Sequence, residues 1–422
     1  MRKKIITAML AAVLCTSTVL LAVAANAQPM VTTLAGASSH NTHAGGDGNF
    51  NLPAAVFGGD DQLFVVDTFN NVIRGVNASG DAQLVAGSVL ALDATRFPAG
   101  RYSDGCLQSA LFNRPTDGVV SPGGRIIIAD SLNHAIRIIQ DDQVLTFAGG
   151  ERAGMINGSA EIALFNHPTA LAIDPQGNIY VADTLNHVIR MITPDGMVST
   201  FAGMPGLPGY ADSLAMSSRF YSPMGIAVSA DGARVYVADT GNHLIRVIED
   251  GEVRTLAGSL RFPSGAELVD LELDDDDWAT TPLGGFANGT GANAVFNLPM
   301  GLALHGDNLI VADSANHMIR SVTPTGEVTI LAGIGLPDYI NGPADQAAFH
   351  MPRGVFVRDR ELFVADTGNN LVRRIVIEPA SYSLRPDTEI SDTHSDDLSA
   401  EWETMPATGD ELAQGDEGSS VE

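Results

Sequence analysis

A carboxylate, an amide and a guanidinium recur together six times along the chain and are the first candidates for chemistry. In each copy an Asn follows an Asp by three residues and an Arg follows it by seven. An Asp at a turn can accept backbone N–H groups, and an Arg can pair with a carboxylate. Because an enzyme needs one asymmetric site, six equivalent copies indicate a structural role. The aspartates are Asp67, Asp130, Asp183, Asp239, Asp313 and Asp366, and the arginines are Arg74, Arg137, Arg190, Arg246, Arg320 and Arg373.

Four of these copies carry a His directly after the Asn, at His134, His187, His243 and His317. Four imidazoles suggest a metal ion, whose bonds to its ligands are about 2 Å long. On separate repeats they should lie too far apart for one ion. We therefore expect them to pack the turns.

Other chemistry is limited by composition. Lys3 and Lys4 are the only lysines, so a chain that lost its N-terminus could not use Schiff-base chemistry or complete a Walker-type phosphate loop. The sequence contains no His-Glu-x-x-His and no Gly-x-Ser-x-Gly. Cys106, the only cysteine beyond residue 27, is expected to be an inert thiol.

A second candidate for metal binding is the acidic insertion from Leu268 to Trp278. An extra strand there would place Asp270, Glu272 and Asp274 on one face, where carboxylates could hold calcium. The spacing does not match an EF-hand loop, and a charged strand that protects a sheet edge is the default interpretation.

Residues 1–27 have the basic, apolar and small-residue regions of a secretory signal peptide, so we expect a secreted or periplasmic protein. The apolar run is also long enough for an uncleaved membrane anchor, although the small-residue site favours cleavage. The formal net charge is −27, and loss of Arg2, Lys3 and Lys4 would lower it to −30. This charge argues against nucleic acid and anionic lipid as partners and favours cationic partners, metal ions or simple solubility.

The elements that must position these residues are short strands. Each copy lies in a strand, tight turn and strand. An apolar strand precedes each copy, after Phe-Asn-x-Pro in four copies and after a looser version of it in two. A Val-x-Thr-Leu-Ala-Gly strand follows, as at Val198 to Gly203, Val253 to Gly258 and Val328 to Gly333. Successive motif aspartates are 53 to 74 residues apart, a period that suits four-stranded propeller blades. A Thr-Leu-Ala-Gly strand, Val31 to Gly36, precedes the first set, and the sixth set lacks one. We predict an all-β, six-bladed propeller of four-stranded blades, closed by the N-terminal strand.

The tripeptide Asn242-His243-Leu244 and its counterparts resemble the NHL-repeat family of β-propellers, over roughly residues 31–377. The resemblance implies a six-bladed propeller, expected here over residues 28–378, but does not imply one activity. Residues 379–422 are acidic and poor in apolar residues, and we expect a disordered tail that solvates the protein or docks a basic partner.

Function is expected where the copies differ, beside the Pro that begins each innermost strand. The connections between blades should gather on one face around the channel mouth. Arg114 and Arg353 could hold an anionic group, and His167 and His350 belong to opposite blades. Local hydrogen bonding or loop packing is the alternative for each residue. The candidates are Arg114, Asp117, His167, Thr169, Met224, Met300, His350 and Arg353.

The leading hypothesis is a non-enzymatic, monomeric binding module for a protein, peptide or glycan, without a cofactor. The alternative is a metal-assisted lyase or hydrolase, similar to peptidyl-hydroxyglycine amidating lyases or gluconolactonase-like propellers, which use zinc or a divalent ion such as calcium. No position matches either metal site, so no ligand residue is carried over. Stoichiometric metal in the purified protein, or turnover of a lactone, ester or amidated-peptide precursor, would favour the enzyme. A structural component of the cell envelope is a third interpretation.

Overall fold

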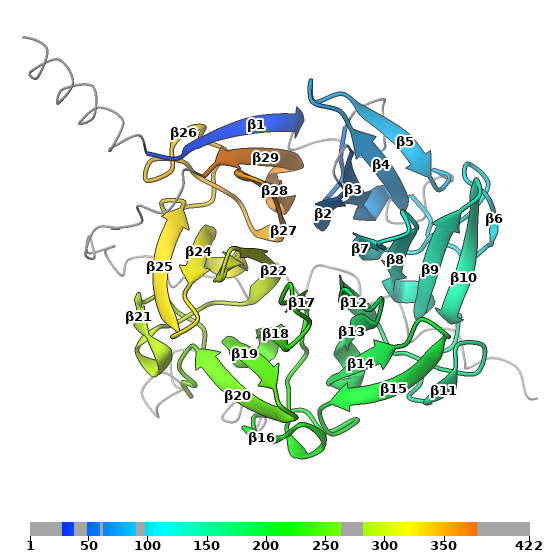
Figure 1. Cartoon of the computed structure of the whole chain (residues 1–422). Coiled ribbons are helices and arrows are strands. Elements are labelled where there is room, and N and C mark those ends of the chain that lie inside the picture. Colours follow the sequence, from blue (N-terminus) through cyan, green and yellow to red (C-terminus); the bar gives the residue numbers. More distant parts are fainter. Residues whose placement is uncertain (1–27, 38–48, 60–61, 90–97, 263–281, 378–422) are drawn as a thin grey trace, which may run out of the picture. The chain divides into compact units, whose positions relative to one another are not determined.

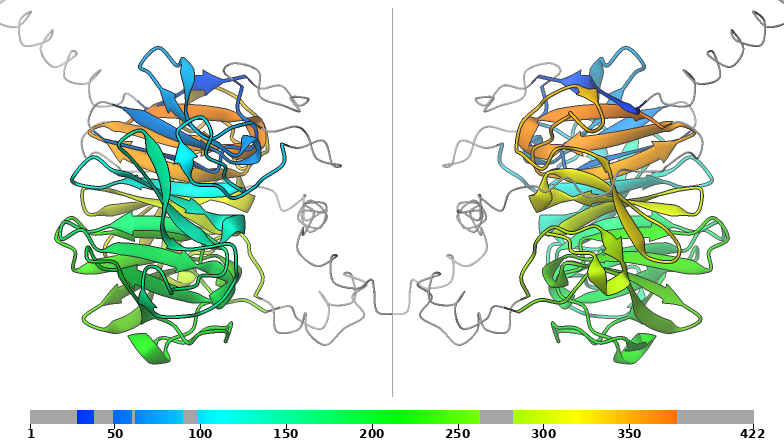
Figure 2. Two further views of the ribbon diagram at one scale, coloured as in Figure 1. Left: turned by 90° about the vertical axis from the view of Figure 1, so that its right-hand side faces the viewer. Right: turned by 90° about the vertical axis from the view of Figure 1, so that its left-hand side faces the viewer.

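The computed structural model describes residues 28–37, 49–59, 62–89, 98–262 and 282–377. These residues form six antiparallel sheets arranged as the blades of a propeller around a central channel (Figure 1). Seen edge-on, the strands run across the ring between its two faces (Figure 2). The predicted all-β, six-bladed propeller is confirmed.

Each blade contributes one inner strand to the channel and three further strands toward the rim. The first blade contains β2 (Ala55–Gly58), β3 (Leu63–Asp67), β4 (Val72–Val76) and β5 (Ala82–Ala86). The second contains β7 (Pro115–Val120), β8 (Ile126–Asp130), β9 (Ala135–Gln140) and β10 (Gln143–Gly149). The third contains β12 (Pro168–Ile173), β13 (Ile179–Asp183), β14 (Val188–Ile192) and β15 (Met197–Ala202).

The remaining blades repeat this order. The fourth contains β17 (Gly225–Val228), β18 (Arg234–Asp239), β19 (Leu244–Glu249) and β20 (Glu252–Ala257). The fifth contains β22 (Pro299–His305), β23 (Asn308–Asp313), β24 (Met318–Val322) and β25 (Glu327–Ala332). The sixth contains β27 (Pro352–Arg358), β28 (Glu361–Asp366), β29 (Leu371–Val376) and, at the rim, β1 (Met30–Gly36).

The N-terminal strand closes the ring. β1 pairs antiparallel with β29, from Met30 opposite Val376 to Gly36 opposite Leu371. The inner strands contact one another in sequence around the channel, and β27 contacts β2. The predicted closure by the Thr-Leu-Ala-Gly strand is confirmed.

A short fifth strand, which the sequence analysis did not predict, lies at the outer edge of five blades. It belongs to the connection that enters the blade and pairs with that blade's outermost strand. These strands are β6 (Gly105–Cys106), β11 (Gly158–Ser159), β16 (Ser213–Leu214), β21 (Gly289–Thr290) and β26 (Gly342–Pro343). They cover edges that would otherwise expose unpaired backbone groups.

One turn of 3₁₀ helix joins the second and third strands of each blade. A residue with left-handed backbone, φ between 51° and 58°, ends each turn. His or Asn occupies this position in every blade, and Asn and His tolerate left-handed geometry better than most residues. The turns are η1 (Thr68–Asn70), η2 (Ser131–Asn133), η3 (Thr184–Asn186), η5 (Thr240–Asn242), η8 (Ser314–Asn316) and η9 (Thr367–Asn369); η4 (Ala215–Ser217) and η7 (Gly291–Asn293) lie in connections.

The core consists of apolar clusters that each join neighbouring blades. Between the inner strands, the backbones approach so closely that a side chain would not fit. A Cβ on Gly225 would lie 1.8 Å from the carbonyl oxygen of Met300, and one on Gly301 would lie 2.1 Å from that of Arg353. Glycine therefore permits the contact between the fourth, fifth and sixth inner strands.

Several predictions fall on residues outside the described ranges: the signal peptide at 1–27, the acidic tail and the insertion that carries Asp270, Glu272 and Asp274. Within the ranges that are described, no helix has the length and apolar character needed to cross a membrane.

Candidate functional site

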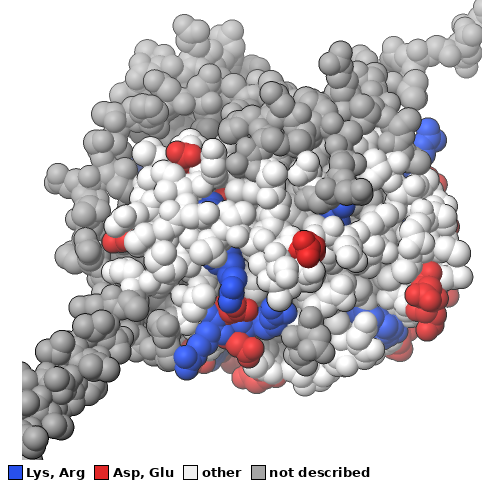
Figure 3. Space-filling view, turned by 90° about the horizontal axis from the view of Figure 1, so that it is seen from above, with Lys and Arg blue, Asp and Glu red and all other residues white. Residues whose placement is uncertain are grey.

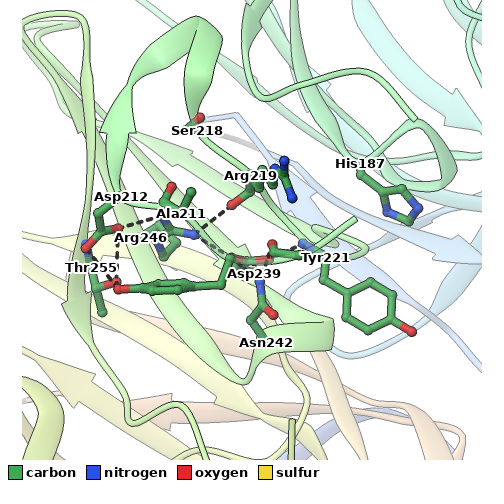
Figure 4. A network of polar contacts seen from close by, with 12 residues as sticks. His187, Ala211, Asp212, Ser218, Arg219, Tyr221, Asp239, Asn242, Arg246 and Thr255 are labelled. Carbon is green, nitrogen blue, oxygen red and sulfur yellow. Dashed lines mark hydrogen bonds and ion pairs between the residues drawn. The ribbon is translucent and has the colours of Figure 1, made fainter. Parts of the chain in front are cut away.

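The repeated Asp and Arg form a buried ion pair in every blade, shown for the fourth blade in Figure 4. Oδ1 of Asp239 accepts the backbone N–H of Tyr221 at 2.7 Å, and Oδ2 accepts the Asn242 amide at 2.9 Å. Nη1 of Arg246 donates to the same Oδ2 at 2.7 Å. The carboxylate thus ties together the start of the inner strand, the turn and the third strand.

The guanidinium reaches further into the entering connection. Arg246 also donates to the carbonyl oxygens of Arg219 and Ala211 and to Oδ1 of Asp212, and it lies against the rings of Tyr210 and Phe220. The other blades repeat the ion pair at 2.6 to 2.8 Å, with Nε replacing Nη1 in Arg74. None of the twelve repeated residues is among the described residues that line the central cavity. Their geometry serves blade construction.

The residue that ends each 3₁₀ turn connects its blade to the next one. Nδ1 of His243 accepts the backbone N–H of Leu298 at 2.9 Å, and Oδ1 of Asn370 accepts that of Leu52 at 2.7 Å, across the point of ring closure. The contact to the next blade goes beyond the turn packing that the sequence predicts for these histidines. The other four bonds are His134 to His167, His187 to Ser222, His317 to Met351 and Asn71 to Arg114.

Accepting a hydrogen bond through Nδ1 requires a neutral imidazole, because both ring nitrogens of a protonated His are donors. Burial lowers the pKa of each of the four histidines, to about 4 for His243 and His317. For His317, the nearby His350 lowers the pKa further. The environment therefore favours the protonation state that the contacts between blades need.

The motif hydroxyl adds a second contact between blades. Thr240 donates to the carbonyl oxygen of Pro299 at 2.7 Å, and Thr367 donates to that of Pro53 at 2.7 Å. Ser131, Thr184 and Ser314 donate in the same way to the Pro of the following blade. The motif turn and the Pro that begins the next inner strand consequently lie at the same face of the ring.

The inner strands surround a central cavity of about 320 Å³. Aligning the blades at their inner-strand Pro shows one position that faces this cavity directly after the Pro: Ala54, Thr116, Thr169, Met224, Met300 and Arg353. Apart from Asp117 and Arg353, the described residues that line the cavity are uncharged. The charged groups of the lining are therefore one carboxyl group and one guanidinium.

Asp117 occupies the second position after the Pro, where the fourth, fifth and sixth blades have glycine. Its Oδ1 accepts the N–H of Gly118, and its Oδ2 accepts the N–H of Leu171 in the third blade, each at 2.8 Å. Burial raises the pKa of Asp117 to about 7 against the effect of these two bonds. The carboxyl group bridges two inner strands and has both oxygens engaged.

Arg353 lies deep in the ring with part of its surface open to the cavity. No hydrogen bond or ion pair joins its guanidinium to another residue of the described ranges. Burial lowers the pKa of Arg353 to about 10, so the side chain remains a cation at neutral pH. It is a positive charge that faces the cavity.

Five of the eight sequence candidates line the cavity: Asp117, Thr169, Met224, Met300 and Arg353. The hydroxyl of Thr169 is already hydrogen-bonded to that of Thr184 at 2.6 Å. The sequence analysis did not select Phe57 and Phe356, which also line the cavity four positions after their Pro. The same alignment at Pro would have identified them.

The other three candidates lie outside the cavity lining. Arg114 lies over the ring of Phe69 at 3.4 Å, and the His350 ring packs edge-on against His317 with centroids 5.6 Å apart. Burial lowers the pKa of His167 to about 4, with smaller contributions from the charges of His134 and Arg353. Arg353 belongs to the sixth blade and His167 to the third, so the guanidinium acts electrostatically across the channel.

A metal centre was sought among the same residues. Within the described ranges, no group of three or more His, Cys, Asp or Glu side chains could hold a metal ion. Cys106 is exposed at the outer edge of the second blade.

The charged residues on the rim differ from those in the channel. On the side of the ring seen in Figure 3, most basic side chains of the described residues lie beside acidic ones rather than in a separate patch. Arg234 and Glu249 on the rim, both partly exposed, form an ion pair of this kind at 2.7 Å. Arg353 differs because it faces the cavity.

Comparison with known proteins identifies the repeat family and two relatives. The sequence model of the NHL repeat matches residues 165–190 and 220–248. The chain is 30% identical over 287 residues to Protein SUPPRESSOR OF QUENCHING 1, chloroplastic, of Arabidopsis thaliana, covering 65% of this chain and 26% of that protein. It is 32% identical over 139 residues to NHL repeat-containing protein 2 of Homo sapiens, covering 30% of this chain and 19% of that protein. The chain thus spans about a quarter of the length of these relatives or less.

Among solved structures, an auxiliary nutrient binding protein from Bacteroides ovatus ATCC 8483 is similar in fold, with a TM-score of 0.57. The match covers 83% of this chain and 77% of that one at 16% sequence identity, which supports the fold alone.

Proposed function

Since the chain belongs to the NHL-repeat propellers, we propose that it is a binding module for a protein, peptide or glycan, and that its ligand enters the central channel. Entry is at the face where the inner strands begin. One observation carries this proposal. The residues that build the blades recur six times, whereas the residues that face the channel change from blade to blade.

The pattern around the inner-strand Pro makes the difference clear. In five blades the carbonyl oxygen of this Pro accepts a hydrogen bond from a hydroxyl group of the preceding blade. The fold therefore fixes the position of the Pro. The next residue is Ala, Thr, Thr, Met, Met or Arg in the six blades. A position that keeps its backbone contacts while varying its side chain is suited to ligand recognition.

Two methionine side chains in the cavity lining also favour ligand binding. Met224 and Met300 face the cavity in adjacent blades, and methionine side chains adapt to ligands of different shape. A cavity that combines apolar side chains with a few convergent polar groups is a usual form of ligand site.

Two tryptophan substitutions test the proposal on arrays of peptides and glycans. Met224→Trp should fill the channel and abolish the capture of ligands that the native protein retains. Leu214→Trp is the matched control, because Leu214 lies on the rim with 62% of its surface exposed, and it should leave capture unchanged. Equal capture by both variants would place the binding surface elsewhere, and an array with no retained ligand would contradict a binding role.

We further propose that the protein acts in the periplasm or outside the cell, because residues 1–27 have the regions of a secretory signal peptide. N-terminal sequencing of the protein recovered from its native source should begin at Gln28. A protein that begins at Met1 or Arg2 and is found in the cytoplasm would contradict this location.

A further inference from the structure

Resting on the proposed function, we propose that Arg353 anchors a carboxylate inside the channel and that the ligand carries this carboxylate on an apolar group. The C-terminal end of a peptide and a small organic acid both have this chemistry. The proposal goes beyond the assignment of a binding face because it names the anchor and the group it binds.

Arg353 occupies a position that is uncharged in the other five blades. Ala54, Thr116, Thr169, Met224 and Met300 occupy the equivalent place in the other blades, so packing of this layer does not require a cation. The backbone of Arg353 is held in the same way as that of its counterparts, since its carbonyl lies against Gly301 and the neighbouring Pro352 accepts the Ser314 hydroxyl at 2.6 Å. Arg353 therefore differs from its counterparts in its side chain and not in the placement of its backbone.

Arg353 differs from the arginines that build the blades, which are paired with carboxylates. Arg137, Arg190, Arg246, Arg320 and Arg373 are fully buried, and each has a carboxylate within 2.8 Å. Arg353 is partly buried and has no such partner among the described residues. Removing a guanidinium from water is costly unless an anion and hydrogen bonds compensate. A carboxylate provides both, because it can accept two parallel N–H bonds from the guanidinium.

The cavity lining contains one carboxyl group that could pair with Arg353. Asp117 is the other charged group of the lining, but both its oxygens accept backbone N–H groups. No ion pair or hydrogen bond joins Asp117 and Arg353 among the described residues, so the guanidinium remains available to a ligand.

The rest of the lining defines the body of the ligand. Met224, Met300, Phe57 and Phe356 supply apolar surface in a space of about 320 Å³. Pockets for small ligands begin at about this size. A short aliphatic chain or one apolar C-terminal residue suits these side chains.

The test uses the protein from Gln28 to Glu422 and measures dissociation constants by NMR titration. The probes are hexanoate, hexanol, and the tetrapeptide Gly-Ala-Val-Leu as its free acid and as its C-terminal amide. Arg353→Met removes the charge and keeps the length of the side chain. Arg358→Met is the matched control, because Arg358 lies on the same strand, outside the cavity, and pairs with Glu361. Urea unfolding of each variant verifies that it is folded.

A charge-assisted hydrogen bond should favour hexanoate over hexanol by at least about tenfold. R353M should lose that preference while it binds hexanol as before, and R358M should retain it. Binding of the peptide acid but not of the amide would identify a C-terminus as a source of the carboxylate. Binding of hexanoate alone would identify a small acid. Both results support the anchor.

Two outcomes overturn the inference in different ways. If hexanol binds and hexanoate binds no better, or if R353M keeps the preference, the channel is a site and Arg353 is not its anchor. If no probe binds to the native protein, the channel itself is not the site, and the proposed function fails with the inference.

Discussion

Nδ1 of His243 lies 2.9 Å from the backbone nitrogen of Leu298, across the seam between the fourth and fifth blades. The imidazole must be neutral to accept this N–H, and Nε2 lies 3.2 Å from the carbonyl oxygen of Pro282, which fixes the tautomer with the proton on Nε2. The contact therefore couples the packing of two blades to the protonation of one side chain.

His243 should make the protein less stable in acid. Burial lowers the pKa of His243 to about 4, against the opposing effect of the bond to Pro282, while the unfolded chain has the ordinary value of 6.5. The unfolded state therefore takes up the proton first as the pH falls, and stability is lost from pH 6.5 toward pH 4. The loss should be about 3 kcal/mol at most.

His243→Asn tests this coupling by urea unfolding at pH 7.5 and 4.5. Asn serves as the acceptor in the first and sixth blades, so H243N should keep most of the stability at pH 7.5 and lose part of the acid sensitivity. His243→Leu leaves the Leu298 N–H without its acceptor and should cost about 1–3 kcal/mol at pH 7.5. Equal acid sensitivity of H243N and the native protein would contradict the assignment.

Arg246→Met should be strongly destabilising, because it leaves the Asp239 carboxylate buried without its cation. Removing one partner of a buried pair costs about 3–5 kcal/mol. The matched control is Arg254→Met, since Arg254 is half exposed and lies 3.5 Å from Glu249, and its loss should cost less than about 1 kcal/mol. Urea unfolding provides both values. Similar costs for the two variants would show that the buried pair has no special role in the blade.

Gly225→Ala should destabilise the contact between the fourth and fifth blades. Its Cβ would lie 1.8 Å from the carbonyl oxygen of Met300, a backbone atom that can move only with its strand. Such overpacking costs about 1–3 kcal/mol or more. Gly150→Ala is the control, since nothing lies within 4 Å of its added Cβ, and it should change stability by about 0.5 kcal/mol or less. A neutral G225A in thermal and urea unfolding would contradict the close approach.

The architecture was predictable because its signals are local and repeated. Asp239, Asn242 and Arg246 lie within eight residues of one another, and their six copies fix the strand and turn pattern. The hydrogen bond from Leu298 to His243 was not predictable in the same way, because 55 residues separate the two. The partner is determined by which inner strand lies beside the turn, and only the closed ring shows that.

The candidate site was predictable in part for a similar reason. Residues after the inner-strand Pro, such as Met300 and Arg353, are placed by strand alternation and line the cavity. Residues before the Pro are not. Arg114 and His167 have left-handed backbone with φ of 50° and 57°. This conformation is uncommon for residues other than glycine, and the sequence did not predict it here. That geometry directs Arg114 onto Phe69.

Ring closure provides the last prediction. Val31 of β1 is fully buried, and the strand pairs with β29 over its whole length, so loss of β1 would expose both an apolar surface and the unpaired edge of the sixth blade. A protein of residues 37–422 should unfold at lower urea concentration than residues 28–422 and should aggregate on size-exclusion chromatography. A protein of residues 28–378 tests the other boundary, and its unfolding should match that of residues 28–422. Residues 37–422 that remain monomeric with unchanged stability would show that β1 is dispensable for closure. A loss of stability in residues 28–378 would move the boundary of the propeller into the acidic segment.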